Sequence, residues 1–323
     1  MSLPILALQL VVADPTWADL ASKIPIDPPP EEITRGLHYV RSDELRHDLF
    51  HDRIKDKGGV FVGVGTNQNY LMAAWAKPEK LVIIDFDMIV IHVHDAYRAF
   101  FLHAKTPDEF LELWRPRIAP RKVAYGKINA TYPNQRKRAA DARKALKQFG
   151  ARVFYALEQM RDEMKKHGRD SFMSDQAQFD TIKKLFEEDR VLAIRGDFTG
   201  NRTMRGLADA LSTLNEEIDV LYVSNVEQYI GWNKKYRRNM LSLPLADNSV
   251  VLRTYGWGKH RTADHNYRYY AMPGPLFRTW LENKKSRYVT DCLKKTEQPS
   301  GIEGYHELTK GPGGETVELA EKN

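Results

Sequence analysis

The 323-residue chain contains a single cysteine, Cys292. One thiol cannot close an intrachain disulfide, and it cannot supply the several cysteines of a structural zinc site. The chain also lacks an apolar run of the roughly 18 residues that a membrane-spanning helix requires. These absences exclude a disulfide framework, a cysteine-based zinc centre and a helical membrane span, and they predict a soluble protein of a reducing compartment.

Familiar signatures of hydrolases and nucleotidases are missing as well. The sequence has no GxSxG nucleophile elbow, no P-loop and no HExxH helix, which removes the main support for those enzyme classes. His92 and His94 resemble a metal-binding pair, but two residues apart on a helix they point about 200° from each other. A shared metal ion is therefore not expected.

The first 45 residues carry few signs of a folded domain. Residues 3–13 form an apolar stretch about as long as the core of a signal peptide, but no Lys or Arg precedes it. We therefore expect a cytoplasmic protein, with secretion as the less favoured alternative. Three consecutive prolines at 28–30 then indicate an extended lead-in, so residues 1–45 are interpreted as an N-terminal extension.

Residues 46–296 have the pattern of one α/β domain. A buried strand at 60–64 is followed by a glycine turn, a helix at 68–76 and a second buried strand at 81–87, which together make a βαβ unit. We predict a Rossmann-like, mostly parallel sheet with helices on both faces. The further elements expected are helices at 43–54, 88–103 and 203–214 and strands at 191–200, 218–225 and 249–255.

Residues 106–188 interrupt this alternation. Helical patterns at 135–148 and 153–166 predict a largely helical insertion that covers one end of the sheet. Between residues 115 and 147 there are eleven Lys or Arg against a single acid, Asp141, and such a stretch can attract phosphates or an acidic partner. A solvated helix face explains the same composition.

The residues from 297 to 323 combine Gly, Pro and scattered charge. This composition predicts a disordered tail.

The first strand ends in Gly63 and Gly65, the conformationally free residues with which α/β sheets begin a nucleotide site. Asp85 follows Gly63 by 22 residues. A carboxylate that binds a ribose hydroxyl is expected about 20 residues after such a turn. The combination favours an adenosine-containing ligand over a plain α/β scaffold.

The residues inside the turn favour S-adenosylmethionine (SAM) over NAD as that ligand. Gln68 replaces the third glycine of a dinucleotide fingerprint, and Thr66 and Asn67 precede it. Asp197, followed by Phe198, ends the third strand and offers an acceptor for the adenine amino group of SAM. A turn or a helix cap is the alternative role of Asp197. All five residues are included in the predicted cofactor site.

The string SNVEQY follows the fourth strand, at the edge where open α/β sheets bind ligands. Asn225, Glu227 and Tyr229 are the predicted catalytic residues, because an amide and a phenol can orient an acceptor while a carboxylate takes its proton. Gln228 is assigned to substrate binding. In the alternative interpretation, Asn225 caps the next helix and Glu227 lies in its first turn.

The stretch 256–270 mixes Gly, His, Arg and Tyr without a clear period and predicts a long loop. His260, His265 and Tyr267 are assigned to substrate binding, because cations and aromatics can cover a substrate or stack on bases. A surface loop without such a role is the alternative.

Four segments, VFVGVGTNQNYLMAA, LVIIDFD, GDFTG and LYVSNVEQYI, resemble the motif set of a widespread bacterial family described as SAM-dependent methyltransferase-like. The resemblance covers residues 38–255 and implies a class I methyltransferase fold, with Gly63 and Gly65 in the SAM turn and Asp85 as the ribose acid. It implies no substrate. Directly after Asp85 the chain departs from the family, so Asp87 is a second candidate for the ribose contact.

The sequence therefore predicts a soluble enzyme that transfers the methyl group of SAM to a nitrogen or oxygen nucleophile of an unidentified acceptor. The basic insertion favours an acceptor that is anionic or part of a larger molecule. The main alternative is a catalytically silent protein of the same fold that binds nucleic acid or an acidic partner. A weaker alternative is an NAD-dependent enzyme.

Overall fold

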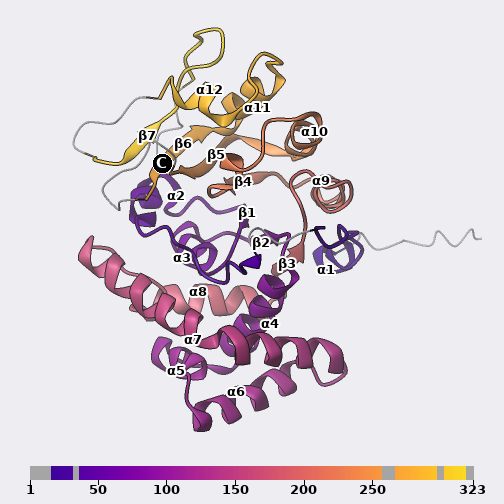
Figure 1. The fold of residues 1–323 in the computed structure, drawn as a ribbon, viewed down its shortest axis with the longest axis vertical. Helices are drawn as coiled ribbons and strands as arrows, with labels where there is room; N and C mark the ends of the chain where they lie inside the picture. Colours follow the sequence, from indigo (N-terminus) through magenta and orange to yellow (C-terminus); the bar gives the residue numbers. More distant parts are fainter. Residues whose placement is uncertain (1–15, 32–35, 257–265, 297–301, 318–323) are drawn as a thin grey trace, which may run out of the picture.

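The computed structural model describes residues 16–31, 36–256, 266–296 and 302–317. Within them, a seven-stranded sheet runs in the order β3-β2-β1-β4-β5-β6-β7 (Figure 1). β6 pairs antiparallel with β5, and β7 runs parallel to β6. The expected mostly parallel α/β sheet is confirmed, because its first five strands are all parallel: β1 (Val60–Val64), β2 (Lys80–Asp85), β3 (Val191–Arg195), β4 (Ile218–Tyr222) and β5 (Leu245–Tyr255).

Helices cover both faces of the sheet (Figure 1), and each face has its own apolar core. No helix among the described residues combines the length and apolarity needed to cross a membrane. One face carries α2 (His51–Ile54), α3 (Asn67–Ala76) and α4 (Met88–His103), and the other carries α1 (Trp17–Ala21), α9 (Thr203–Thr213), α10 (Lys234–Ser242), α11 (Gly274–Glu282) and α12 (Val289–Leu293).

The insertion is helical, as expected, and it packs on α3 and α4. It forms the lower end of the molecule in Figure 1. Every residue of α3 is buried because the helix lies between the sheet and this second helical layer. The four insertion helices are α5 (Pro107–Trp114), α6 (Ile118–Thr131), α7 (Arg136–Lys166) and α8 (Gln176–Glu187).

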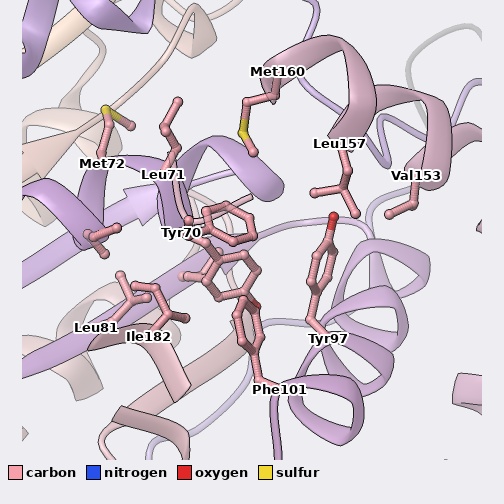
Figure 2. Close-up of a cluster of buried hydrophobic side chains, with 14 of the residues drawn as sticks. Tyr70, Leu71, Met72, Leu81, Tyr97, Phe101, Val153, Leu157, Met160 and Ile182 are labelled. Carbon is pink, nitrogen blue, oxygen red and sulfur yellow. The ribbon is translucent and has the colours of Figure 1, made fainter. Parts of the chain in front are cut away.

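The helical stretches expected at 135–148 and 153–166 are confirmed, and they form one continuous helix, α7. Its apolar stripe does not stop at the glycine between them. Figure 2 shows Val153 and Leu157 of α7 pointing toward Tyr97 of α4. Gly150 is buried inside the helix and lies against Leu146. Packing of this stripe outweighs the propensity cost of about 1 kcal/mol that an internal glycine carries.

Two expectations need correction. The helix predicted at 43–54 is confined to a 3-10 turn, η2 (His47–Phe50), and to α2, while Glu44 before it accepts hydrogen bonds from Ser224 and Thr254. The tail expected to be disordered from 297 includes β7 (Tyr305–Glu307), whose Tyr305 is buried in the core. Strand pairing with β6 supplies the backbone hydrogen bonds that composition alone did not predict.

The N-terminal extension docks on the sheet edge through one buried carboxylate. Asp27 accepts hydrogen bonds from the backbone N–H groups of Asp197 (3.1 Å), Asn201 (3.0 Å), Arg202 (2.9 Å) and Thr203 (3.4 Å). These donors belong to the loop between β3 and α9 and to the start of α9, where a negative charge is favourable. An acid from the extension therefore caps a helix that begins about 175 residues later.

Replacing this carboxylate tests the docking. We expect Asp27→Ala to lower the free energy of unfolding by about 2 kcal/mol, because charge-assisted hydrogen bonds are lost and buried donors are left without a partner. Asp209→Ala, on the exposed face of α9, is the matched control and should change it by less than about 0.5 kcal/mol. Urea unfolding measures the free energy of unfolding of both variants. Equal values for Asp27→Ala and Asp209→Ala would contradict this role of Asp27.

Candidate functional site

A cavity of about 360 Å³ opens at the carboxyl ends of β1 to β4. The sheet order reverses between β1 and β4, which is where open α/β sheets bind ligands. Its volume falls within the range of roughly 300 to 1,000 Å³ typical of small-molecule sites. The predicted site residues that line it are Gly65, Thr66, Gln68, Asp85, Asp197, Phe198, Asn225 and Tyr229.

The glycine turn after β1 is held by a side chain of its own helix. Gly65 has a φ of +95°, which only glycine adopts without strain. The Gln68 Oε1 atom accepts hydrogen bonds from the Thr66 backbone N–H (3.0 Å) and the Thr66 hydroxyl (3.1 Å). A Cβ atom added to Gly65 would lie 2.4 Å from the Gln68 Nε2 atom. The amide of Gln68 thus fills the space beside the turn.

Three other residues of this segment have structural roles and do not line the cavity. A Cβ atom on Gly63 would lie 1.9 Å from the Oδ1 atom of Asn69, so this glycine makes room for a buried side chain. Asn69 itself donates to the carbonyls of Val64 (2.9 Å) and Thr66 (3.1 Å). Asn67 faces the insertion, where its Nδ2 atom lies 3.6 Å from the sulfur of Met160. Gly63 and Asn67 therefore support the predicted cofactor turn from behind.

His94 fixes the carbonyl of the same turn. Its Nε2 atom lies 2.8 Å from the Gly65 oxygen, and its Nδ1 atom lies 2.7 Å from the Tyr70 hydroxyl. With Nε2–H donating to the carbonyl and the phenol donating to Nδ1, the ring is neutral. Burial lowers the pKa of His94 to about 4, although the contact with Gly65 opposes the shift. The sequence offered no sign of this role beyond a histidine on an apolar helix.

Of the two candidate ribose acids, only Asp85 lines the cavity. Burial raises its pKa to about 7, while the hydrogen bond from the Asp87 N–H (2.8 Å) works against the rise. Asp87 instead begins α4, where it accepts from the Ile89 N–H (2.9 Å) and contacts the Nδ1 atom of His38 (2.6 Å). The geometry therefore selects Asp85 as the carboxylate that can reach a ligand.

Asp197 combines the two roles considered for it. Its Oδ1 atom accepts from the backbone N–H (2.7 Å) and the hydroxyl (2.8 Å) of Thr199, which closes a turn. The same residue and Phe198 also line the cavity. The cap of α9 is supplied by Asp27 and not by Asp197. The turn consequently presents an acid and an aromatic ring to a ligand at the end of β3.

The SNVEQY segment forms a 3-10 turn, η3 (Val226–Gln228), and divides its side chains between the cavity and the core. Asn225 and Tyr229 line the cavity. Gln228 is buried and its side-chain oxygen accepts from the backbone N–H of Gly256. It holds the end of β5, and it does not reach the cavity.

Glu227 faces the interior of the protein, so its prediction as a catalytic base is wrong. Its carboxylate accepts hydrogen bonds from the indole N–H of Trp232 (2.8 Å) and the hydroxyl of Tyr236 (2.6 Å). The Arg253 Nε atom lies 3.2 Å from its Oε2 atom, and both side chains are almost fully buried. A carboxylate neutralised in this way is a structural ion pair of the core beneath β5.

A second wall of the cavity, which sequence reasoning missed, comes from the N-terminal segment. Its lining residues include Tyr39, Arg41 and Asp43. The Tyr267 hydroxyl donates to the Oδ2 atom of Asp43 (2.8 Å) and accepts from the Asn225 side-chain amide (3.1 Å). Burial raises the pKa of Asp43, although the hydrogen bond from Tyr267 opposes the rise. Tyr267 thus orients two lining residues without lining the cavity itself.

Glu44 anchors this wall to the sheet. Its buried carboxylate accepts hydrogen bonds from Ser224 (2.6 Å) and from the hydroxyls of Tyr222 and Thr254, and it contacts the His47 Nε2 atom (3.0 Å). Burial raises the pKa of Glu44, but the His47, Ser224 and Thr254 contacts outweigh it and hold the pKa below its usual value. A charged Glu44 therefore fixes the position of its neighbour Asp43.

Two assignments cannot be placed. His260 and His265 lie outside the described residues. Among the residues that are described, no group of three or more His, Cys, Asp or Glu side chains could hold a metal ion.

The charges around the cavity favour a cationic or neutral ligand. Three acidic side chains line it, those of Asp43, Asp85 and Asp197, against the single guanidinium of Arg41, and Asp85 carries only part of its charge at neutral pH because its pKa is about 7. Such a lining attracts positive charge and repels a polyanion at close range.

Comparison with known families adds a classification without a function. A family model described as a domain of unknown function (DUF7790) matches residues 39–309, which include the second cavity wall and all seven strands. No curated protein matches the chain.

The buried His94 gives the protein a characteristic pH dependence. Because the folded chain keeps this ring neutral to about pH 4 while the unfolded chain binds a proton near pH 6.5, stability is present above pH 6.5 and is lost as the pH falls toward 4. We expect the wild type to lose about 2 kcal/mol more of its free energy of unfolding between pH 7 and 5 than His94→Gln. Denaturant titrations at both pH values test this; equal losses would show that His94 is protonated in the folded state.

Proposed function

The chain belongs to the DUF7790 family, and because that family has no assigned function, we propose from the site itself that the protein is a SAM-dependent methyltransferase of class I type. The acceptor in this proposal is a nitrogen or oxygen nucleophile. The observation that supports this proposal most strongly is an acidic cavity at the point where the strand order of the sheet reverses. It lies between a glycine turn and two carboxylates at strand ends. The motif resemblance noted in the sequence agrees with this choice.

The residues around the cavity suit the parts of SAM. Asp85 can accept hydrogen bonds from the ribose hydroxyls. Asp197 can accept from the adenine amino group while the Phe198 ring packs on the base. The sulfonium and the ammonium of SAM are both cationic, and a cavity with three carboxylates and one guanidinium stabilises them. Gly65 allows the backbone of the turn to approach the ligand closely.

The same features disfavour NAD. A pyrophosphate needs free backbone N–H groups at the start of the helix after the turn. Here the Gln68 side chain already accepts the hydrogen bond of the Thr66 N–H. Its amide also lies beside Gly65, in the space that a phosphate approaching the turn would need. The carboxylates of the cavity would also repel two phosphates.

The chemistry falls to the wall formed by Asp43 and Asn225. When bound, SAM supplies a methyl carbon whose bond to sulfur breaks as the bond to the acceptor forms, with the electron pair staying on sulfur. Asn225 orients the acceptor, and Asp43 takes the proton that the acceptor loses. The raised pKa of Asp43 makes it a better base than an exposed carboxylate, and Tyr267 holds it in place. Asp43 thus replaces Glu227 in the role that the sequence assigned.

Calorimetric titration tests the cofactor. We expect binding of SAM and S-adenosylhomocysteine and none of NAD. Gly65→Val should abolish that binding, because a β-branched residue clashes with Gln68 and cannot adopt a φ of +95° without strain of about 1 to 3 kcal/mol. Gly126→Ala, on α6 with open space beside it, is the control and should bind as the wild type does. Absence of heat with both adenosyl compounds would refute the proposal.

The raised pKa of Asp85 predicts how binding depends on pH. Only the ionised carboxylate accepts both ribose hydrogen bonds, so the affinity for S-adenosylhomocysteine should rise about 10-fold from pH 6 to 8, as Asp85 titrates near pH 7. Asp85→Asn should bind about 10- to 100-fold more weakly at pH 8 and show no such rise. Asp209→Asn serves as the control. The same pH profile in Asp85→Asn would exclude Asp85 from the cofactor site.

A further inference from the structure

The solvent face of α7 carries a row of cations that leads to the cavity. We define the α7 stripe as Lys144, Lys147, Arg152 and Tyr155, all of which are exposed. At about 100° per residue the four side chains fall within an arc of about 140° on the exposed side of α7, with Lys147 and Arg152 at its two limits. No acid occurs between residues 142 and 157. The stripe therefore carries three positive charges, from Lys144 to Arg152, and ends in the uncharged ring of Tyr155.

Several cations elsewhere in the insertion already have partners, and the stripe differs from them. Lys137 pairs with Asp141 (2.6 Å), Arg138 pairs with Asp95 (2.7 Å), and Arg143 hydrogen-bonds to Asn129. Within the part of the chain that the structure describes, Lys144 and Lys147 form no ion pair. The charge of Lys147 is available to a partner outside the molecule, while that of Lys144 also acts on Asp141, whose pKa is lowered by Lys137 and, less strongly, by Lys144.

The stripe is continuous with the second wall of the cavity. Gln159, one turn after Tyr155, accepts a hydrogen bond from Arg41 (3.5 Å), and Arg41 lines the cavity. Farther back, the Phe149 ring contacts the ring of His38 (centroids 5.4 Å apart) and the guanidinium of Arg152 (5.7 Å). From Lys144 to Gln159 the helix extends about 22 Å. A chain-like ligand can therefore follow α7 and reach the cavity.

Two exposed aromatic rings also line the cavity. Tyr39 is 47% exposed and Tyr229 is 57% exposed, although large hydrophobic side chains are usually covered. Exposed aromatic side chains beside a basic track are the features with which proteins hold single-stranded nucleic acid, because bases stack on the rings while cations contact phosphates. The carboxylates inside the cavity exclude the phosphates and leave room for a neutral base.

We propose that the methyl acceptor is a base of a single-stranded nucleic acid, whose phosphates lie along the α7 stripe while the base enters the cavity beside Tyr39 and Tyr229. The reaction assigned to the base rests on the proposed methyltransferase function, but the binding of the strand does not. A duplex is disfavoured, because a paired base must leave its stack before it can enter a cavity.

Fluorescence anisotropy with a labelled 20-nucleotide single-stranded RNA, without SAM, tests the binding. We expect affinity to fall steeply with salt and to drop at least roughly 10-fold in Lys144→Glu/Lys147→Glu, since two phosphate contacts become repulsive. The control Lys284→Glu/Lys285→Glu changes the net charge equally at exposed positions outside the stripe and should lose less than about 2-fold. A DNA strand of the same sequence and the matching RNA duplex show which form is preferred.

A second variant separates base recognition from charge. Tyr39→Ala/Tyr229→Ala should weaken RNA binding roughly 5- to 100-fold, the effect of losing stacked bases, and leave binding of inorganic polyphosphate unchanged. Equal losses in the two lysine double variants, or equal affinity for polyglutamate and for RNA, would overturn the proposal. Titration with S-adenosylhomocysteine is a separate measurement. A protein that binds RNA but does not bind S-adenosylhomocysteine would refute the methyltransferase, and one that binds S-adenosylhomocysteine but not RNA would refute only the nucleic-acid acceptor.

Discussion

The buried carboxylate of Glu44 joins the N-terminal segment to β4, which ends at the cavity, and to its neighbour β5. Its partners Tyr222 and Ser224 lie on or just after β4, and Thr254 lies on β5. A buried charge is stable only when its hydrogen-bonding capacity is filled, and four partners fill it here. This anchor supports one wall of the cavity, together with the hydrogen bonds of Tyr267 to Asp43 and of Arg41 to Gln159. The candidate site thus depends on a residue that does not line it.

The same segment separates two regions of opposite charge. On its inner side, Asp43 joins Asp85 and Asp197 in an acidic cavity. On its outer side, Arg41 contacts Gln159 at the exposed face of α7, and His38 packs on the buried ring of Phe149. Two regions of opposite charge that packed side chains keep apart can act on different parts of one ligand. A ligand with a polyanionic backbone and neutral bases has that division. The proposed cofactor and the proposed acceptor therefore use the two regions without competing for them.

Sequence patterns predicted the strand-end half of the site and missed the other half for a physical reason. Gly65, Asp85 and Asn225 each follow a buried strand, and parallel strands bring their carboxyl ends to one edge. Asp43 reaches the same edge from a segment that precedes the first strand. Its partner Tyr267 lies 224 residues away in the sequence. Glu227 was misplaced because its orientation is set by Arg253, a partner on another strand. The periodicity of α7 was clear, and both helical stretches predicted there belong to this one helix.

Gln68 links the fold to the kind of ligand that the turn can accept. In a pyrophosphate site the helix start after β1 offers empty N–H groups, and the glycines exist to let phosphates approach them. Here a side-chain amide satisfies the Thr66 N–H from within the protein, so the turn is complete before any ligand arrives. Its electrostatic attraction for an anion is correspondingly reduced, while Gly65, whose φ is +95°, leaves the space beside the turn to the Gln68 amide. A turn of this kind is suited to a nucleoside that carries no phosphate, and the identity of one glutamine therefore separates the two ligand classes more sharply than the glycines do.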